Sequence, residues 1–416
     1  MKLKELGPGL ITGAADDDPS GIATYSQAGA QFGFNMLWTV VFTFPLMVGI
    51  QMISARLGCM TGRGLAANIK ARFPKSLLYS IVWLLLLANT INIAADIAAM
   101  SEALRLLLGG SAHVYSVTFG LLCLVLQVFL RYETYVRYLK WLTLGLLAYV
   151  AVVFTIHVPW LKVAESTVWP HLTLNNDTIT MIVAVFGTTI SPYLFFWQAA
   201  QEAEDLGALE KKNGNGNLLP YAMDVAQRHL RRIKWDTNIG MGFSNLIAFF
   251  IILTTAATLN TAGVIDIQTS AQAAQALRPL AGEFAFLLFG LGIIGTGMLA
   301  VPVLAGSAAY AVAETFGWRA GLDLKPIEGR GFYAIIAIAT LGGVFLDFTT
   351  MDPMKELFWS AVINGLIAVP IMVVMMLLGS QERIMGQFVI GKRLRRLGWL
   401  ATATMAIAVV AMIATM

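Results

Sequence analysis

Three adjacent carboxylates interrupt the first long apolar stretch of this chain. Asp16, Asp17 and Asp18 stand directly before Pro19, and mostly apolar residues flank them between positions 10 and 34. A charge at bilayer depth costs at least ~2.5–3.5 kcal/mol, and a proline removes a backbone hydrogen bond from a helix. Because broken polar backbone within a membrane is tolerated mainly where it lines a cavity, the triplet predicts a broken helix at an ion or solute site.

The composition excludes an ordinary soluble protein. Of the 416 residues, 57% are hydrophobic and 12% are charged, and the mean hydropathy is +0.72. These values predict a multi-pass helical protein of the cell membrane, surrounded by the lipid bilayer. The net charge of +4 is explained by basic loops, so no nucleic-acid partner is expected. The N-terminal segment lacks the pattern of a cleavable signal peptide. Cys59 and Cys123 form no metal or disulfide framework, and no motif indicates a cofactor or an enzyme.

Hydropathy predicts eleven transmembrane helices, because about 20 apolar residues are needed to cross a ~30 Å hydrocarbon core. The expected spans are Leu10–Gln31, Met36–Ala55, Leu77–Leu107, Val114–Leu130, Leu139–Val158, Ile179–Ala200, Ile239–Leu259, Glu283–Val312, Gly331–Phe345, Glu356–Leu378 and Trp399–Met416.

Loop charges predict the orientation of these spans. If the N-terminus is cytoplasmic, the cytoplasmic loops hold 24 of the 28 Lys and Arg residues. The outer side holds only Arg105, Lys162, Arg278 and Lys355. This asymmetry follows the positive-inside rule. We therefore expect the N-terminus in the cytoplasm and the C-terminus outside the cell.

A second interruption lies in the sixth span, where Ser191 and Pro192 follow the small polar residues 187–189. Spans one and six are five apart, so the second set of five spans must run inverted relative to the first. Paired broken helices indicate a transporter site built from inverted repeats. We expect one transporter domain over residues 1–378, with repeats at about 7–158 and 179–378. Residues 379–416 then form a cytoplasmic basic connection and an extra eleventh helix.

Several strings resemble the natural resistance-associated macrophage protein (NRAMP) family of metal transporters, over nearly the whole chain. They are Gly7-Pro8-Gly9, Asp18-Pro19, Ala23-Thr24 and residues 27–33 in the first span, Ala55 to Gly58 and Thr61 to Arg63 after the second, Asp96-Ile97-Ala98 in the third, and Met385-Gly386 before the eleventh. The resemblance implies an all-α, leucine-transporter-like fold with broken helices one and six, divalent cation transport and, by analogy of fold, a monomer.

The chain departs from the family pattern at three motifs. The family's Asp-Pro-Gly-Asn is Asp18-Pro19-Ser20-Gly21 here, its Met-Pro-His is Ser191-Pro192-Tyr193, and the acid that ends its Asp-Ile-Ala-Glu is Ala99. These changes remove a soft thioether ligand, an Asn ligand and two titratable groups. In this respect the chain is similar to the NRAMP-related magnesium transporters.

The remaining candidate ligands are oxygens, which suit Mg²⁺ and Mn²⁺. Gly21 in place of Asn also widens the site, which favours a partly hydrated ion. We expect import of Mn²⁺ and Mg²⁺ by alternating access, with weak or absent proton coupling. The expected metal site comprises Asp18, Asp17, Ser20, Gly21, Thr188 and Ser191.

Other polar residues are candidates for proton transfer or for the vestibule: Asp16, Asp96, Tyr193 and Asn364. Successive helical residues point about 100° apart, so the three adjacent acids cannot all face one ion. Asp96 could carry protons, pair with an Arg or make a structural hydrogen bond.

Two other functions remain open. One is the usual NRAMP activity of proton-coupled Mn²⁺ or Fe²⁺ transport. The other is sodium-coupled transport of an organic solute, which the same fold also supports.

Overall fold

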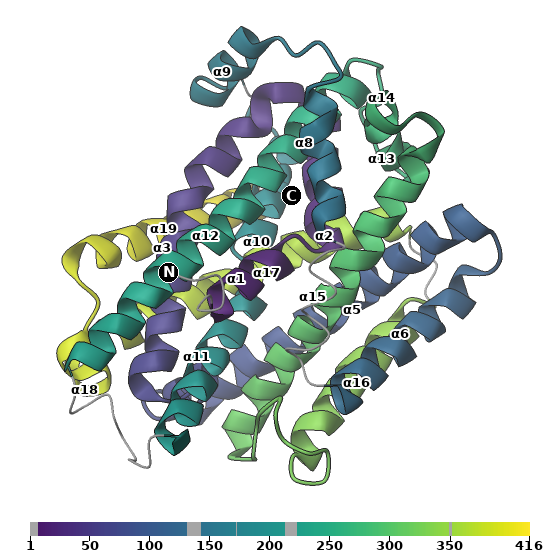
Figure 1. Ribbon diagram of the computed structural model, residues 1–416. Helices are drawn as coiled ribbons and strands as arrows, with labels where there is room; N and C mark the ends of the chain where they lie inside the picture. The colour runs from purple at the N-terminus through teal and green to yellow at the C-terminus, as the bar shows by residue number, and fades with distance from the viewer. Residues whose placement is uncertain (1–6, 131–142, 172, 213–222, 349–351) are drawn as a thin grey trace.

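The computed structural model describes residues 7–130, 143–171, 173–212, 223–348 and 352–416, and these residues contain helices and no strand (Figure 1). The helices are α1 Pro8–Asp16, α2 Pro19–Phe32, η2 Gly33–Met36, α3 Leu37–Thr61, α4 Leu65–Lys70, α5 Lys75–Leu108, α6 Ala112–Phe129, η3 Thr143–Leu146, α8 Leu147–Val153, α9 Trp160–Val168, α10 Asn176–Thr189, α11 Pro192–Lys212, α12 Met223–Thr255, η4 Ala256–Asn260, α13 Ser270–Ala274, η5 Gln275–Leu277, α14 Arg278–Ala281, η6 Gly282–Phe284, α15 Ala285–Phe316, α16 Arg330–Leu346, α17 Pro353–Gly379, α18 Glu382–Met385, η7 Gly386–Phe388 and α19 Lys392–Thr415.

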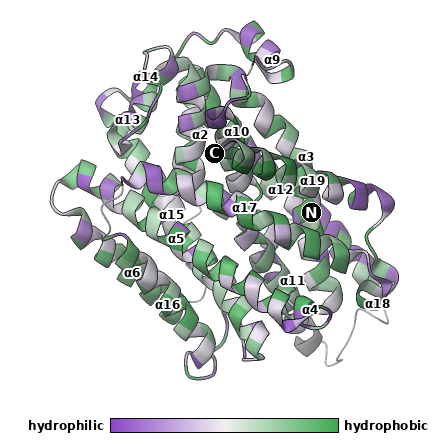
Figure 2. Cartoon of the chain, turned by 180° about the vertical axis from the view of Figure 1, so that it is seen from behind, coloured by the Kyte–Doolittle hydropathy of each residue, from purple (hydrophilic) through white to green (hydrophobic). Residues whose placement is uncertain are grey.

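Eight helical stretches of the described residues are long and apolar enough to cross a membrane. One of them, Pro19–Thr61, joins the second half of the predicted first span to the second span, and the shorter apolar helix α16 matches the ninth. Figure 2 shows hydrophobic residues along α6 and α16 on the outside of the bundle. Exposed Phe129 and Phe345 belong to these faces, which therefore suit contact with lipid.

Predicted boundaries are wrong at three places. The eleventh span begins at Lys392 rather than Trp399, so the basic residues before it belong to helix α19. The described part of the fifth span ends at Val153 rather than Val158, and a further helix, α9, begins at Trp160. Pro159 accounts for the break, because a proline disfavours the helical conformation of the residue before it. Residues 139–142 of this span lie outside the described residues.

The third place is the polar stretch 201–234, which lies between the predicted spans Ile179–Ala200 and Ile239–Leu259. It is helical on both sides of residues 213–222, since α11 continues to Lys212 and α12 begins at Met223. Its Ala, Glu, Leu and Lys residues are strong helix formers, which explains the extension.

Both predicted helix breaks are present, and they face each other. The first separates α1 from α2 at Asp17, and the second separates α10 from α11 at Ile190. Tyr193 donates a hydrogen bond to the Ala15 carbonyl oxygen at 2.9 Å, and the Tyr25 and Thr189 hydroxyl oxygens lie 3.0 Å apart. The four half-helices therefore meet at one place in the middle of the bundle (Figure 1).

Close glycine packing fixes α1 against α12. A Cβ atom at Gly9 would lie 2.8 Å from the backbone nitrogen of Thr237, and one at Gly240 would lie 2.9 Å from the Cα atom of Leu10. No side chain fits at these crossings, so the two backbones approach closely. We call the end of the bundle at which α1 begins the basic end and the opposite end the vestibule end.

Candidate functional site

Asp18 lies at the first helix break and begins α2. Its Oδ1 atom accepts a hydrogen bond from the Gly21 backbone N–H at 2.7 Å, and Pro19 occupies the first helical position. This is the usual arrangement of an N-cap followed by proline. The Oδ2 atom accepts a hydrogen bond from the Asn92 amide at 3.0 Å and lies 3.4 Å from the Tyr193 hydroxyl oxygen. The one proton of that hydroxyl is shared between Asp18 and the nearer Ala15 carbonyl oxygen. Donors from α2, α5 and α11 thus converge on one carboxylate, which is 2% exposed.

Asp16 and Asp17 lie at the end of α1 and face α12. The Ser244 hydroxyl oxygen is 2.6 Å from Oδ2 of Asp16 and 3.0 Å from Oδ1 of Asp17. A serine hydroxyl carries one proton, so it donates to only one of them at a time. The Oδ1 atom of Asp16 is buried without a hydrogen-bond partner in the described part of the chain.

The three acids do not converge on a single point. Among the described residues, no group of three or more His, Cys, Asp or Glu side chains is placed to hold a metal ion. A metal bound beside Asp18 therefore needs hydroxyl or backbone oxygens in addition to carboxylates.

The second helix break supplies such oxygens. The Ser191 hydroxyl oxygen lies 2.6 Å from the backbone oxygen of Thr188 and 3.1 Å from that of Gly187, and it donates its one proton to one of them at a time. Position 21 faces this break, because a Cβ atom there would lie 3.1 Å from Oγ1 of Thr188 and 3.4 Å from the backbone oxygen of Asp16. Even a methyl group at position 21 would therefore crowd Thr188, so the two breaks approach closely because residue 21 is glycine.

Helix α17 closes the site on a further side. Ser20 donates to the Leu357 backbone oxygen at 3.1 Å, and Ser360 lies 3.1 Å from the Ser20 hydroxyl. Asn364, one turn further along α17, is buried, and its Oδ1 atom has no hydrogen-bond partner among the described residues.

Asp96 lies on α5, one turn from Asn92. It is fully buried, and neither carboxylate oxygen makes a hydrogen bond of regular geometry within the described residues, although the Ser20 backbone N–H interacts with the carboxylate. No described Lys or Arg pairs with it, so the expected alternative of an Arg partner is wrong for the described residues.

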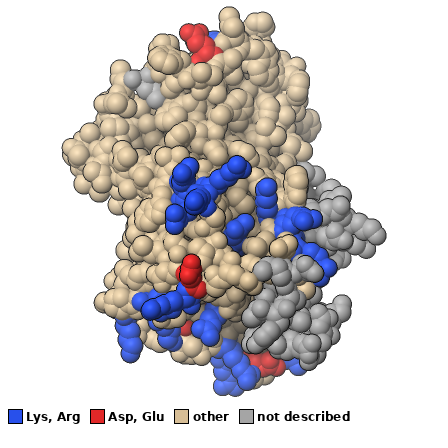
Figure 3. Space-filling model, turned by 90° about the vertical axis from the view of Figure 1, so that its left-hand side faces the viewer, with Lys and Arg blue, Asp and Glu red and all other residues tan. Residues whose placement is uncertain are grey.

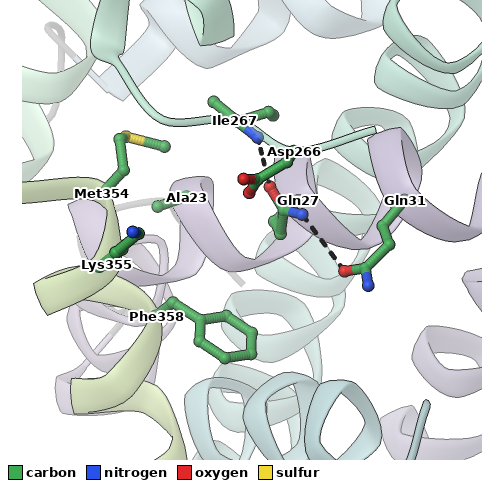
Figure 4. A pocket seen from close by; sticks show the side chains of 8 residues that line it. All are labelled: Ala23, Gln27, Gln31, Asp266, Ile267, Met354, Lys355 and Phe358. Atoms are coloured by element: carbon green, nitrogen blue, oxygen red, sulfur yellow. Dashed lines mark hydrogen bonds between the residues drawn. The ribbon is translucent and has the colours of Figure 1, made fainter. Parts of the chain in front are cut away.

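A cavity of about 160 Å³ opens beside α2 at the vestibule end (Figure 4). Gln27 accepts a hydrogen bond from the Ile267 backbone N–H at 2.8 Å and donates one to Gln31 at 3.2 Å. A neighbouring cavity of about 210 Å³ contains the carboxylates of Glu102 and Asp352. The first cavity is lined by Ala23, Gln27, Gln31, Asp266, Ile267, Met354, Lys355 and Phe358.

At the basic end, polar contacts join α1, α11 and α12. Asp236 accepts hydrogen bonds from the backbone N–H groups of Gly9, at 2.8 Å, and Leu10, at 3.2 Å. One turn earlier on α12, Arg232 forms ion pairs with the buried Glu202 and, at 3.0 Å, with Asp205. These contacts hold the start of α1 against α12, and α11 against α12, at this end of the bundle.

Sequence reasoning missed four of these residues: Asn92 as a partner of Asp18, Ser244, Ser360 and Asp236. Asn92 carried a signal, because it is a polar residue in an apolar span one turn before Asp96. Ser244 and Ser360 carried little, since serines are common in membrane helices. All four are paired with residues at least 74 positions away in the chain.

The comparisons with known proteins agree with this arrangement. The family model described as "Natural resistance-associated macrophage protein-like" matches residues 9–415. The divalent metal cation transporter MntH of Klebsiella pneumoniae is 26% identical over 411 residues, which are 97% of this chain and 92% of that protein. The protein of the same name from Aeromonas hydrophila is 29% identical over 320 residues, 73% of this chain and 71% of its own length.

Solved structures show the same fold. The manganese transporter of Eremococcus coleocola, in complex with an aromatic bis-isothiourea substituted compound, matches with a TM-score of 0.75 and 18% identity over 98% of this chain and 86% of that chain. The inward-facing conformation of Mhp1 matches with a TM-score of 0.54 and 12% identity over 98% and 90% of the two chains. The predicted all-α, leucine-transporter-like fold is thereby confirmed, and because the family match spans residues 9–415, this chain belongs to the natural resistance-associated macrophage protein-like family.

Proposed function

We propose that this protein imports divalent metal cations across the cell membrane by alternating access, and that Mn²⁺ and Mg²⁺ are its favoured substrates. The observation that carries the proposal is Asp18, a buried carboxylate at the point where the two broken helices meet. The names of the MntH relatives support the substrate class.

The chemistry of the candidate ligands supports Mg²⁺ beside Mn²⁺. The groups at the two breaks are oxygens: the carboxylates of Asp18 and Asp17, the hydroxyls of Ser20, Thr188 and Ser191, and backbone carbonyls. Oxygen ligands suit hard cations, whereas a thioether favours softer transition metals. Gly21 also takes less space than the Asn of the family motif, which would suit Mg²⁺, because Mg²⁺ dehydrates reluctantly and usually keeps several waters.

Membrane potential suffices to drive this transport. A divalent ion moving to the negative side gains ~4.6 kcal/mol per 100 mV, so a cation can accumulate without coupled protons. Tyr193 and Ala99 offer no carboxylate or imidazole for proton transfer, in keeping with weak or absent coupling. We propose a cytoplasmic N-terminus, an external C-terminus and a monomer, which would place the basic end in the cytoplasm.

The experiment is ion flux into proteoliposomes loaded with a Mg²⁺-sensitive dye, with parallel measurement of Mn²⁺ uptake. Saturable uptake of both ions, driven by an inside-negative potential, is expected. Robust Mn²⁺ flux without Mg²⁺ flux contradicts the proposed selectivity, and the absence of flux for either ion contradicts transport.

Proton-coupled Mn²⁺ transport is the second candidate function, and Asp96 favours it. This acid is fully buried beside the site without a regular hydrogen bond or a described cationic partner, so it could take up a proton. A pH dye inside the same liposomes distinguishes the two functions: acidification that follows Mn²⁺ entry and disappears in Asp96→Asn supports coupling, and a constant internal pH supports uncoupled uptake.

A further inference from the structure

A run of basic residues begins the last helix, α19. Lys392, Arg393, Arg395 and Arg396 occupy its first turn and a half, and all four side chains are exposed. These residues lie at the basic end of the bundle. Helix α17 begins at the vestibule end and runs to the basic end, where α18 and then the start of α19 follow.

The basic run lies in line with the lipid-facing surface of the same helix. Positions 396, 400, 403, 407 and 410 are all exposed and follow one another at intervals of three or four residues, which places them on one helix face. Leu400, Ile407 and Val410 are 51%, 70% and 66% exposed, so this face is apolar and suits acyl chains. Trp399, at 40% exposure, is a residue typical of the membrane–water interface. Arg396 therefore lies where the headgroup of a lipid packed on this face would be.

These charges have no protein counterpart in the described parts of the chain. The ion pairs there join Arg105 with Glu102, Arg232 with Glu202 and Asp205, and Arg278 with Glu283. The nearby carboxylate of Glu382 on α18 pairs with none of the four. Instead, further positive charge approaches from the turn before α5, where Arg72 donates to the Arg383 backbone oxygen at 3.4 Å.

Figure 3 views the side of the molecule on which α18 and α19 lie in Figure 1. Lys and Arg side chains gather over its middle and lower parts with few Asp or Glu side chains between them. This surface is thus strongly positive, and the exposed Leu400, Ile407 and Val410 continue the line of the basic run along α19. Together they complement a molecule that is anionic at one end and apolar at the other.

We propose that the basic run of α19, residues Lys392, Arg393, Arg395 and Arg396, is a binding surface for anionic phospholipid headgroups. The guanidinium and ammonium groups bind the headgroup phosphate, and the acyl chains lie along Leu400 and Ile407. Basic clusters that adjoin a membrane helix on the cytoplasmic side bind anionic lipid in this way. This surface is separate from the cation site at the helix breaks.

The full-length wild type and its variants are reconstituted into vesicles of equal parts phosphatidylglycerol and phosphatidylcholine and then purified. Mass spectrometry measures which of the two lipids each protein retains. The test variant is Lys392→Gln/Arg393→Gln/Arg395→Gln/Arg396→Gln. The matched control is Lys75→Gln/Arg319→Gln/Lys325→Gln/Arg330→Gln, which removes the same charge from exposed positions at the same end of the bundle. Cation flux and monodispersity in neutral lipid verify that each variant is folded.

Each basic group near an anionic surface raises lipid affinity about fivefold. The wild type should therefore enrich phosphatidylglycerol over phosphatidylcholine, the test variant should lose that enrichment by about tenfold or more, and the control should retain most of it. Replacing the three arginines of the run by lysine should keep the enrichment, because the charge remains.

Three results would overturn the proposal. The first is equal enrichment of phosphatidylglycerol in the wild type and the test variant. The second is an equal loss of enrichment in the control variant, which would indicate a general charge effect. The third is displacement of the lipid by millimolar inorganic phosphate, which would indicate a site for free anions.

Discussion

Asn92 donates a hydrogen bond from its side-chain amide to Oδ2 of Asp18, with 3.0 Å between the two atoms. The bond joins α5 to the first helix break. The Gly21 N–H also donates to Asp18, and the Tyr193 hydroxyl, which is shared with the Ala15 carbonyl oxygen, lies 3.4 Å from it. Groups on three helices therefore orient the carboxylate. A cation bound there must share the carboxylate with these donors, so their arrangement should set its affinity.

Replacing Asn92 by Ala should weaken cation binding. A hydrogen bond to a charged group contributes ~1.5–3 kcal/mol, and its loss frees the Asp18 side chain to rotate, so we expect the KM for Mn²⁺ to rise about tenfold. Concentration-dependent uptake into proteoliposomes measures this. Asn89→Ala is the control, because Asn89 lies one turn away and donates to the Leu304 backbone oxygen and to Ser307. Similar KM values for the two variants would show that Asn92 has no special role.

Replacing Ser191 by Met should shift selectivity toward softer ions. The thioether adds a soft ligand at the second break, so Mg²⁺ should compete less well with Mn²⁺ uptake and Cd²⁺ should compete better. Ser191→Ala separates the gain of sulfur from the loss of the hydroxyl. Unchanged Mg²⁺ competition in a Ser191→Met protein that still transports Mn²⁺ would exclude this position from the ligand set.

Replacing Gly21 by Ala should reduce Mg²⁺ flux more than Mn²⁺ flux. The added Cβ atom would lie 3.1 Å from Oγ1 of Thr188 and would occupy space that a partly hydrated Mg²⁺ requires. Dye-reported Mg²⁺ flux and Mn²⁺ uptake in the same preparation give the ratio. Gly242→Ala is the matched control, because a Cβ atom at position 242 would meet only the Phe44 ring, at an ordinary contact distance of 3.6 Å. Equal loss of both ions in Gly21→Ala would count against the hydrated-ion explanation.

Replacing Arg232 by Ala should destabilise the protein strongly. The change leaves the fully buried carboxylate of Glu202 without its partner, and breaking a buried pair costs ~3–5 kcal/mol. Arg105→Ala removes an exposed pair with Glu102 and should cost only ~0–1 kcal/mol. Unfolding in detergent measures both free energies. If Arg232→Ala cost no more than Arg105→Ala, the ion pairs of Arg232 would not stabilise the contact between α11 and α12.

The sequence was sufficient to predict the breaks and the class of fold. A proline beside polar residues inside an apolar span has few structural solutions, so Asp18-Pro19 and Ser191-Pro192 located both breaks. The partners of the site were harder to predict. Ser244 approaches Asp16 from 228 positions away, and hydrophobic periodicity does not specify which faces of two membrane helices meet. The helical extensions of α11 and α12 escaped prediction because hydropathy detects the apolar part of a helix and not its polar ends.

The most direct measurement of the central claim is Mn²⁺ uptake into proteoliposomes with Mg²⁺ as competitor, for the wild type and for Asp18→Ala. Strong competition by millimolar Mg²⁺ in the wild type, together with loss of uptake in Asp18→Ala, is the predicted result. Uptake that survives in Asp18→Ala would place the cation site elsewhere, and wild-type Mn²⁺ uptake that is indifferent to Mg²⁺ would contradict an oxygen-only site of weak selectivity.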